Sequence, residues 1–241
     1  MAMGALTAWG ISALINAGLI LPVTRVPVLT RSGWWHAWAL GTVLGATLGW
    51  QGWLAVVLYL GLGSAVTKLG FARKAELGIA EARGGRRGPE NVWGSAATGT
   101  ALALLSQVPG APTPLLMVGF VASFAAKLGD TCGSEIGKRW GRTTISLSRL
   151  RVVPPGTEGA VSLEGTLASL AGAAVFSLIG CSLSLVGWNL LLPISLIAWL
   201  ATLVESLIGS ELQPQLPWLS NEAVNALMTA IAAAAAMVVL R

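Results

Sequence analysis

The residues best suited to chemistry lie in one polar segment, 127–166, in the middle of an otherwise apolar chain. The segment contains Asp130, the only aspartate of the sequence, and Glu135 five residues later. Basic residues follow, and the segment ends in the turn PPGT (154–157) and the run SLEGT (162–166). Carboxylates, hydroxyls and basic side chains gathered in this way suit a site for a metal ion and phosphates.

Three carboxylates, Asp130, Glu135 and Glu164, are predicted to bind a metal ion. Asp130 follows an apolar run, and an ionised carboxylate at the end of a membrane span is costly unless it is paired or bound to a metal. Glycines at 129 and 133 would let the backbone turn there. Mg²⁺ favours one or two protein carboxylates plus substrate phosphates, and it is the cofactor that we predict.

Each carboxylate also has a purely structural interpretation. At helical spacing, Asp130 would pair with Lys127, and Glu135 would pair with the arginine four residues later. Ser162 would cap the following helix, whose positive N-terminal end would favour Glu164 without any ligand. A carboxylate aimed at a phosphate without a cation would repel it, so the functional role of Glu164 requires the metal.

Phosphate groups would be bound by basic side chains and by turns. Arginines of the loop 68–90 could form charge-assisted bonds with phosphate, although a basic loop that faces lipid headgroups explains most of them as well. The turn 154–159 could present backbone N–H groups to an anion, and so could the helix that begins after residue 162. The predicted phosphate- or nucleotide-binding residues are Lys68, Arg83, Arg86, Arg87, Lys138, Arg139, Gly156, Thr157, Ser162 and Gly165. Asn91 is predicted as a catalytic residue beside the three carboxylates. A neutral amide, unlike a basic residue, gains little from a cytoplasmic position, so the headgroup alternative does not explain it.

The composition is that of a membrane protein. Of the 241 residues, 54% are hydrophobic and 10% are charged, and the mean hydropathy is +0.73; a soluble domain carries about 25% charged residues. The net charge of +5 comes mainly from loops between apolar runs, as in cytoplasmic loops that face anionic headgroups. No nucleic-acid recognition module is readable. The two cysteines, Cys132 and Cys181, form no metal-binding or disulfide pattern.

The apolar runs predict an all-α fold, a polytopic membrane bundle of about eight (seven to eight) transmembrane helices that forms a single domain over 1–241. The expected spans are 4–21, 34–48, 53–66, 92–108, 115–128, 163–186, 190–207 and 223–240.

The charge-free stretch 32–67 decides the topology. As one helix it would be about 54 Å long, against a membrane core of about 30 Å, so we divide it at GWQG (49–52). This division puts the polar loops 68–91 and 129–162 on the same, cytoplasmic face as the first basic loop. Both termini are then expected on the opposite face.

Three segments resemble one known family. GPENVWG (88–94), KLGDTCGSEIGK (127–138) and VPPGTEGAVSLEGTLASLAG (153–172) are similar to the integral membrane family called domain of unknown function 92. That family includes transmembrane protein 19 and the plant and cyanobacterial phytyl-phosphate kinases. The resemblance covers nearly the whole chain, and the SLEGT run also resembles the dolichol and phytol kinases, which use CTP.

The resemblance implies an Mg²⁺-dependent kinase that transfers a phosphoryl group from a nucleoside triphosphate, with CTP as one candidate, to phytyl phosphate or a similar prenyl monophosphate. The diphosphate would serve tocopherol and prenylquinone synthesis. The implied partners are the prenyl phosphate, the nucleotide and membrane lipids, in a cyanobacterial plasma or thylakoid membrane or in the plastid envelope. The motifs carry functional roles onto Asn91, Gly129, Asp130, Glu135, Pro155, Gly156, Thr157, Ser162, Glu164 and Gly165.

Two other functions fit the same residues. A cytidylyltransferase would join a lipid phosphate to CTP and release pyrophosphate, whereas a kinase leaves a nucleoside diphosphate. A lipid-phosphate transporter would place polar residues inside its spans, where this sequence has few beyond Glu205.

Overall fold

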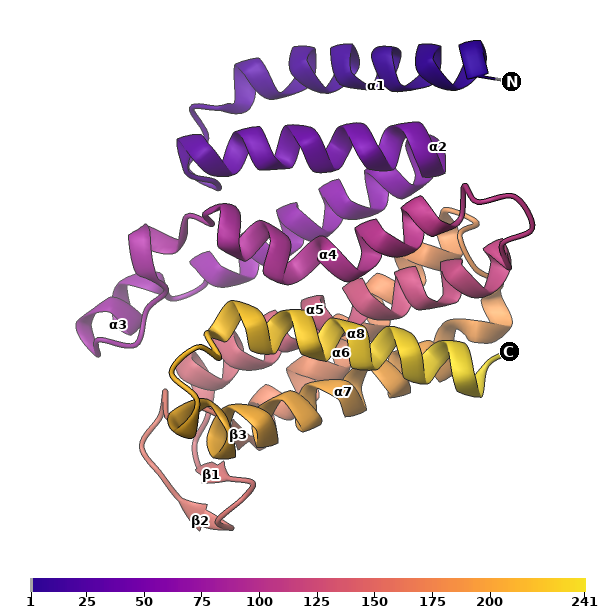
Figure 1. Cartoon of the computed structure of the whole chain (residues 1–241). Coiled ribbons are helices and arrows are strands. Elements are labelled where there is room, and N and C mark those ends of the chain that lie inside the picture. Colours follow the sequence, from indigo (N-terminus) through magenta and orange to yellow (C-terminus); the bar gives the residue numbers. More distant parts are fainter. Residues whose placement is uncertain (1) are drawn as a thin grey trace.

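The computed structural model describes residues 2–241, with side chains from residue 6 onwards, and it is built mainly of helices (Figure 1). The long helices are α1 (Ala2–Val23), α2 (Arg31–Lys68), α4 (Pro89–Leu105), α5 (Thr113–Trp140), α6 (Leu163–Ser182), α7 (Leu191–Glu211) and α8 (Asn221–Val239). The short helical elements are α3 (Phe71–Glu76), η1 (Ala82–Gly85), η2 (Trp188–Leu190) and η3 (Gln213–Gln215). Strands β1 (Thr144–Ser146), β2 (Arg151–Val152) and β3 (Ala160–Ser162) form a small antiparallel sheet in the order β2-β1-β3. The predicted helical membrane bundle is confirmed, with this sheet added in its polar region.

Helix α2 consists of two arms rather than one long rod. The backbone leaves helical geometry at Gly49, whose φ of +68° lies in the left-handed region that glycine adopts at little cost, and Figure 1 shows the chain reversing there. The far ends of the two arms both contact Arg87. The backbone oxygen of Arg87 lies against Gly33, and its guanidinium lies against Gly63. The predicted division at 49–52 is therefore confirmed.

Within residues 2–241, six helical segments are long and apolar enough to cross a membrane, with α2 counted once. Counting the two arms of α2 separately and adding the 17-residue α4 accounts for all eight predicted spans. Figure 1 shows both termini at one end of the bundle, and α3 and the sheet at the other. This is the arrangement predicted from the loop charges.

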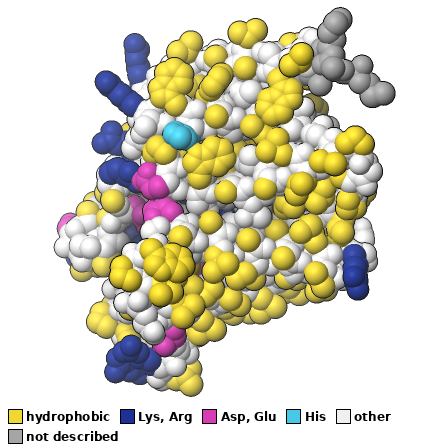
Figure 2. All heavy atoms as spheres, in the orientation of Figure 1, with side chains coloured by type: hydrophobic (Ala, Val, Ile, Leu, Met, Phe, Trp, Pro, Cys, Tyr) yellow, Lys and Arg dark blue, Asp and Glu magenta, His cyan; other side chains and the backbone are white. Residues whose placement is uncertain are grey.

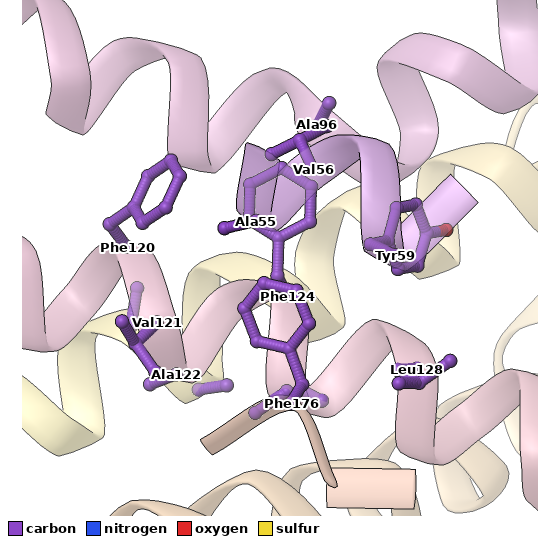
Figure 3. Close-up of a cluster of buried hydrophobic side chains, with 14 of the residues drawn as sticks. Ala55, Val56, Tyr59, Ala96, Phe120, Val121, Ala122, Phe124, Leu128 and Phe176 are labelled. Carbon is purple, nitrogen blue, oxygen red and sulfur yellow. The ribbon is translucent and has the colours of Figure 1, made fainter. Parts of the chain in front are cut away.

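Helix α5 is the centre of the bundle, since it contacts α2, α4, α6, α7 and α8. The aromatic ring of Phe124 in α5 lies 5.4 Å from the ring of Tyr59 in α2 and 5.6 Å from that of Phe176 in α6, measured between centroids. Figure 3 shows these rings within one cluster of buried hydrophobic side chains. A central α5 places the polar residues of its second half between the surrounding helices.

The second half of α5 differs from the prediction, in which the fifth span ends at residue 128 and a polar loop begins. The helix continues beyond that point, and Gly129, Gly133 and Gly137 form a row on one of its faces. Helix α6 packs against this row, with the backbone of Ser169 next to the first glycine. The prediction of a backbone turn was wrong, because small residues at this spacing let two membrane helices approach closely.

Gly129→Ala tests this packing. The added Cβ would lie 2.8 Å from the backbone oxygen of Ser169, so we expect α5 and α6 to separate and the free energy of unfolding to fall by about 1–3 kcal/mol. Gly61→Ala in α2 is the matched control, because a Cβ there meets nothing within 4 Å and alanine is more favourable than glycine in a helix by up to about 1 kcal/mol. Thermal unfolding in detergent measures both variants, and equal midpoints would contradict the packing role.

Candidate functional site

A polar cavity of about 520 Å³ lies at the end of the bundle that carries α3 and the sheet. Figure 2 shows most charged side chains of the visible face at that end, while hydrophobic side chains cover the rest of the face. The two polar segments meet in the cavity wall: a Cβ added at Gly156, whose φ is +85°, would lie 2.7 Å from Ile79. The prediction that these segments come together on one face is confirmed.

A charged cluster lies at the inner end of the cavity, between the helices. Lys127 of α5 is only 8% exposed, and its Nζ donates to Oδ2 of Asp130 at 2.5 Å and to Oδ1 of Asn225 in α8 at 2.9 Å. Glu205 of α7 lies close enough to interact electrostatically with the lysine and the aspartate. The predicted pairing of Asp130 with Lys127 is confirmed, whereas Asn225 was missed. Its one signal in the sequence is an amide within an apolar span.

Glu135 takes part in a second buried ion pair, with Lys74 of α3. The lysine is fully buried, and its Nζ bonds both the Glu135 carboxylate and the backbone oxygen of Thr67, the latter at 3.0 Å. The arginine that helical spacing suggested as a partner, Arg139, instead stacks over the ring of Trp140 at 5.1 Å. That alternative is wrong, because Glu135 lies on the side of α5 that faces α3.

Asn91 joins three elements at the outer rim of the cavity. Its Oδ1 accepts from Nη2 of Arg83 at 2.8 Å and from the backbone N–H of Gly88 at 2.9 Å, and its Nδ2 donates to Glu222 of α8 at 3.0 Å. Arg83 also pairs with Glu90. Asn91 therefore lines the cavity and also fixes the start of α4 against α8.

Most of the predicted phosphate-binding residues line this cavity: Arg83, Arg86, Arg87, Lys138, Gly156, Thr157, Ser162 and Gly165. Two do not. Lys68 donates to the backbone oxygen of Gly84 at 2.7 Å, and Arg139 lies against Trp140 outside the cavity.

Several lining residues already have protein partners. Arg87 donates to the hydroxyl of Tyr59 at 3.0 Å, and Lys138 pairs with Glu81 at 3.2 Å. The Ser162 hydroxyl accepts a hydrogen bond from the backbone N–H of Gly165 at 3.1 Å, so the predicted helix cap is confirmed. The lining therefore combines free polar groups with groups that hold the wall in place.

The three predicted metal ligands are not brought together. Asp130 and Glu135 line the cavity, whereas Glu164 lies outside it, where its carboxylate accepts from the backbone N–H of Arg142 at 3.4 Å. Among the residues that the structure describes, no group of three histidine, cysteine, aspartate or glutamate side chains could hold a metal. Asp130 keeps one oxygen, Oδ1, with only a 3.4 Å contact to the Ser134 hydroxyl. One such carboxylate fits Mg²⁺, which needs one or two protein carboxylates plus phosphates and water.

The comparison with known families decides where the chain belongs. Residues 6–233 match the family model described as integral membrane protein DUF92. The chain belongs to this family. The resemblance seen in the segments 88–94, 127–138 and 153–172 is thereby confirmed, and the DUF92 protein is an integral membrane protein that crosses the bilayer several times.

Relatives of this DUF92 chain occur in bacteria, plants and archaea. An uncharacterized membrane protein of Synechocystis is 44% identical over 232 residues, which are 95% of this chain and 90% of the relative. Protein VTE6, chloroplastic, of Arabidopsis thaliana is 41% identical over 223 residues, 89% of this chain and 67% of the relative. An uncharacterized membrane protein of Methanocaldococcus jannaschii is 27% identical over 170 residues, 70% and 69% of the two chains. No solved structure matches the chain. The first two relatives fit the predicted thylakoid or plastid setting.

Proposed function

We propose that this DUF92 protein is a membrane kinase that transfers a phosphoryl group from a nucleoside triphosphate to a prenyl monophosphate such as phytyl phosphate. One observation carries the proposal: a single cavity joins a buried lysine and a partly buried aspartate between the helices to a rim of arginines from the polar segments. A lipid phosphate, whose tail lies among the helices, reaches the inner end, and a nucleotide enters at the rim.

The similarity to other proteins supports the same proposal. The three segments 88–94, 127–138 and 153–172 resemble those of the phytyl-phosphate kinases, and a chloroplast protein, VTE6, is 41% identical. With this chemistry the protein would act in the synthesis of tocopherol and related prenylquinones.

The reaction needs positioning and charge stabilisation rather than a strong base. The acceptor is a phosphate that is already ionised at neutral pH, so its oxygen attacks the terminal phosphorus, the bond to the bridging oxygen breaks, and the nucleoside diphosphate leaves. This agrees with the place of His36, the single histidine, which accepts from Trp93 at 2.8 Å and does not line the cavity.

Asp130 is the residue that would hold Mg²⁺, through the oxygen that Lys127 leaves free. When bound, the ion neutralises the triphosphate of the nucleotide. The rim residues Arg83 and Arg86 would bind phosphate oxygens and stabilise the charge of the group in transfer.

Product analysis tests the proposal. Purified protein in detergent is incubated with Mg²⁺, each nucleoside triphosphate in turn and phytyl phosphate, and both products are identified by mass spectrometry. We expect phytyl diphosphate and a nucleoside diphosphate, and we expect neither when Mg²⁺ is replaced by a chelator. Pyrophosphate with a CDP-lipid would instead identify a cytidylyltransferase, and no product with any nucleotide would reject the kinase.

A further inference from the structure

We propose that Lys127 and Asn225 form the binding site for the phosphate of the lipid substrate, and that this subsite is separate from the arginine rim, where the nucleotide binds. The assignment rests on the proposed function for the identity of the two ligands. Its evidence is the hydrogen-bonding capacity, the charge and the depth of the two residues.

Lys127 has one N–H donor left over. An ammonium group has three donors, and within the described side chains two of them are used, by Asp130 and by Asn225. The third N–H is therefore available to an acceptor in the cavity, which Lys127 lines.

Asn225 adds donors beside it. Its Oδ1 accepts from Lys127, and no protein acceptor is found for Nδ2 among the described residues. Nδ2 is therefore not fully buried, and it is open to the cavity that Asn225 lines. The lysine and the amide thus offer N–H donors, from two different helices, to one acceptor group.

The charges of the cluster explain how the lysine stays buried and why an anion suits it. Arg87 interacts electrostatically with Lys127 and places a second positive charge at this end of the cavity. Asp130 supplies the negative charge that pairs directly with the lysine. A phosphate oxygen accepts charge-assisted hydrogen bonds, which are roughly twice as strong as neutral ones.

The depth of the site identifies the ligand as a lipid phosphate. Lys127 follows the fully buried residues Ala125 and Ala126 of α5, and Asn225 lies one turn into α8, a helix apolar enough to span the membrane. The rim arginines, in contrast, belong to the loop that includes η1. A phosphate whose apolar tail lies among the helices reaches the lysine, whereas a soluble triphosphate meets the rim first.

Direct binding tests the assignment without relying on turnover. Wild-type protein in detergent is titrated with phytyl phosphate, with phytol and with a non-hydrolysable nucleoside triphosphate. Asn225→Ala removes the amide donors and is expected to weaken phytyl phosphate binding about tenfold, and Asn225→Asp, which adds a negative charge, is expected to weaken it more. Binding of phytol and of the nucleotide should not change in either variant.

Thr229→Val is the matched control. Thr229 lies one turn further along α8, is buried, and bonds to Thr98 without lining the cavity, so its variant should bind phytyl phosphate like the wild type. Equal affinity for phytyl phosphate in the wild type and both Asn225 variants would overturn the subsite, as would a loss confined to the nucleotide. If phytyl phosphate binding depends on Asn225 but no diphosphate forms, the subsite stands and the kinase is rejected.

Discussion

Asp130→Asn is expected to lower the rate of phosphoryl transfer to phytyl phosphate by about 10²–10³-fold, the usual cost of removing one preorganised charged or hydrogen-bonding group from a site. Asp130 lies beside Lys127 in the cavity and keeps its Oδ1 for a ligand, whereas the Lys74 pair holds Glu135 to α3 and Glu164 lies outside the cavity. The amide keeps the shape of the side chain and can still accept from Lys127. The variant should therefore remain folded and inserted.

Initial rates in membranes, at saturating lipid and nucleotide, measure this effect. Glu164→Gln is the matched control, because that carboxylate belongs to the sequence-predicted metal site but does not line the cavity, and its rate should stay close to that of the wild type. Turnover like the wild type in Asp130→Asn would remove Asp130 from catalysis. A comparable loss in Glu164→Gln would favour the three-carboxylate site that the sequence suggested.

Lys74→Met is expected to produce the largest loss of stability, about 3–5 kcal/mol, because it leaves the Glu135 carboxylate buried without its counter-charge. The pair fastens α3 to the second half of α5, so the variant should also loosen the wall of the cavity. The thermal unfolding midpoint in detergent measures the change.

Two further variants show whether the buried charge is the cause. Lys74→Met combined with Glu135→Leu removes both charges and should recover most of the stability, since well-packed apolar residues often replace a buried pair without loss. Arg73→Met removes the neighbouring cation of α3, whose pair with Glu76 is exposed, and should cost less than about 1 kcal/mol. Equal shifts for Arg73→Met and Lys74→Met would contradict the role of the buried pair.

The two lysine–carboxylate pairs of α5 therefore have different roles. Lys74 and Glu135 are both buried and connect a short helix to the bundle, which is a structural task. Lys127 and Asp130 both line the cavity, which Lys74 does not, so this pair can meet a ligand. The difference lies in which lysine reaches the cavity, and residue type alone does not reveal it.

Hydropathy and charge along the chain are enough to predict the membrane class, the positions of the spans and the side on which the polar loops lie. These features follow from properties that add up along the chain: hydropathy over a window, helix length against membrane thickness, and the count of basic residues in each loop. The hairpin within 32–67 is the clearest case, because a rod of that length cannot fit the bilayer.

The end of α5 and the grouping of the site residues depend instead on how the helices pack. The local sequence around Gly129 and Gly133 suggests a turn, but α6, a helix that begins after residue 162, packs against these glycines. Lys74 lies 61 residues from Glu135, and Asn225 lies 98 residues from Lys127. Periodicity and spacing report only on neighbours along the chain, whereas a buried charge takes whichever partner the packing of the helices brings within reach.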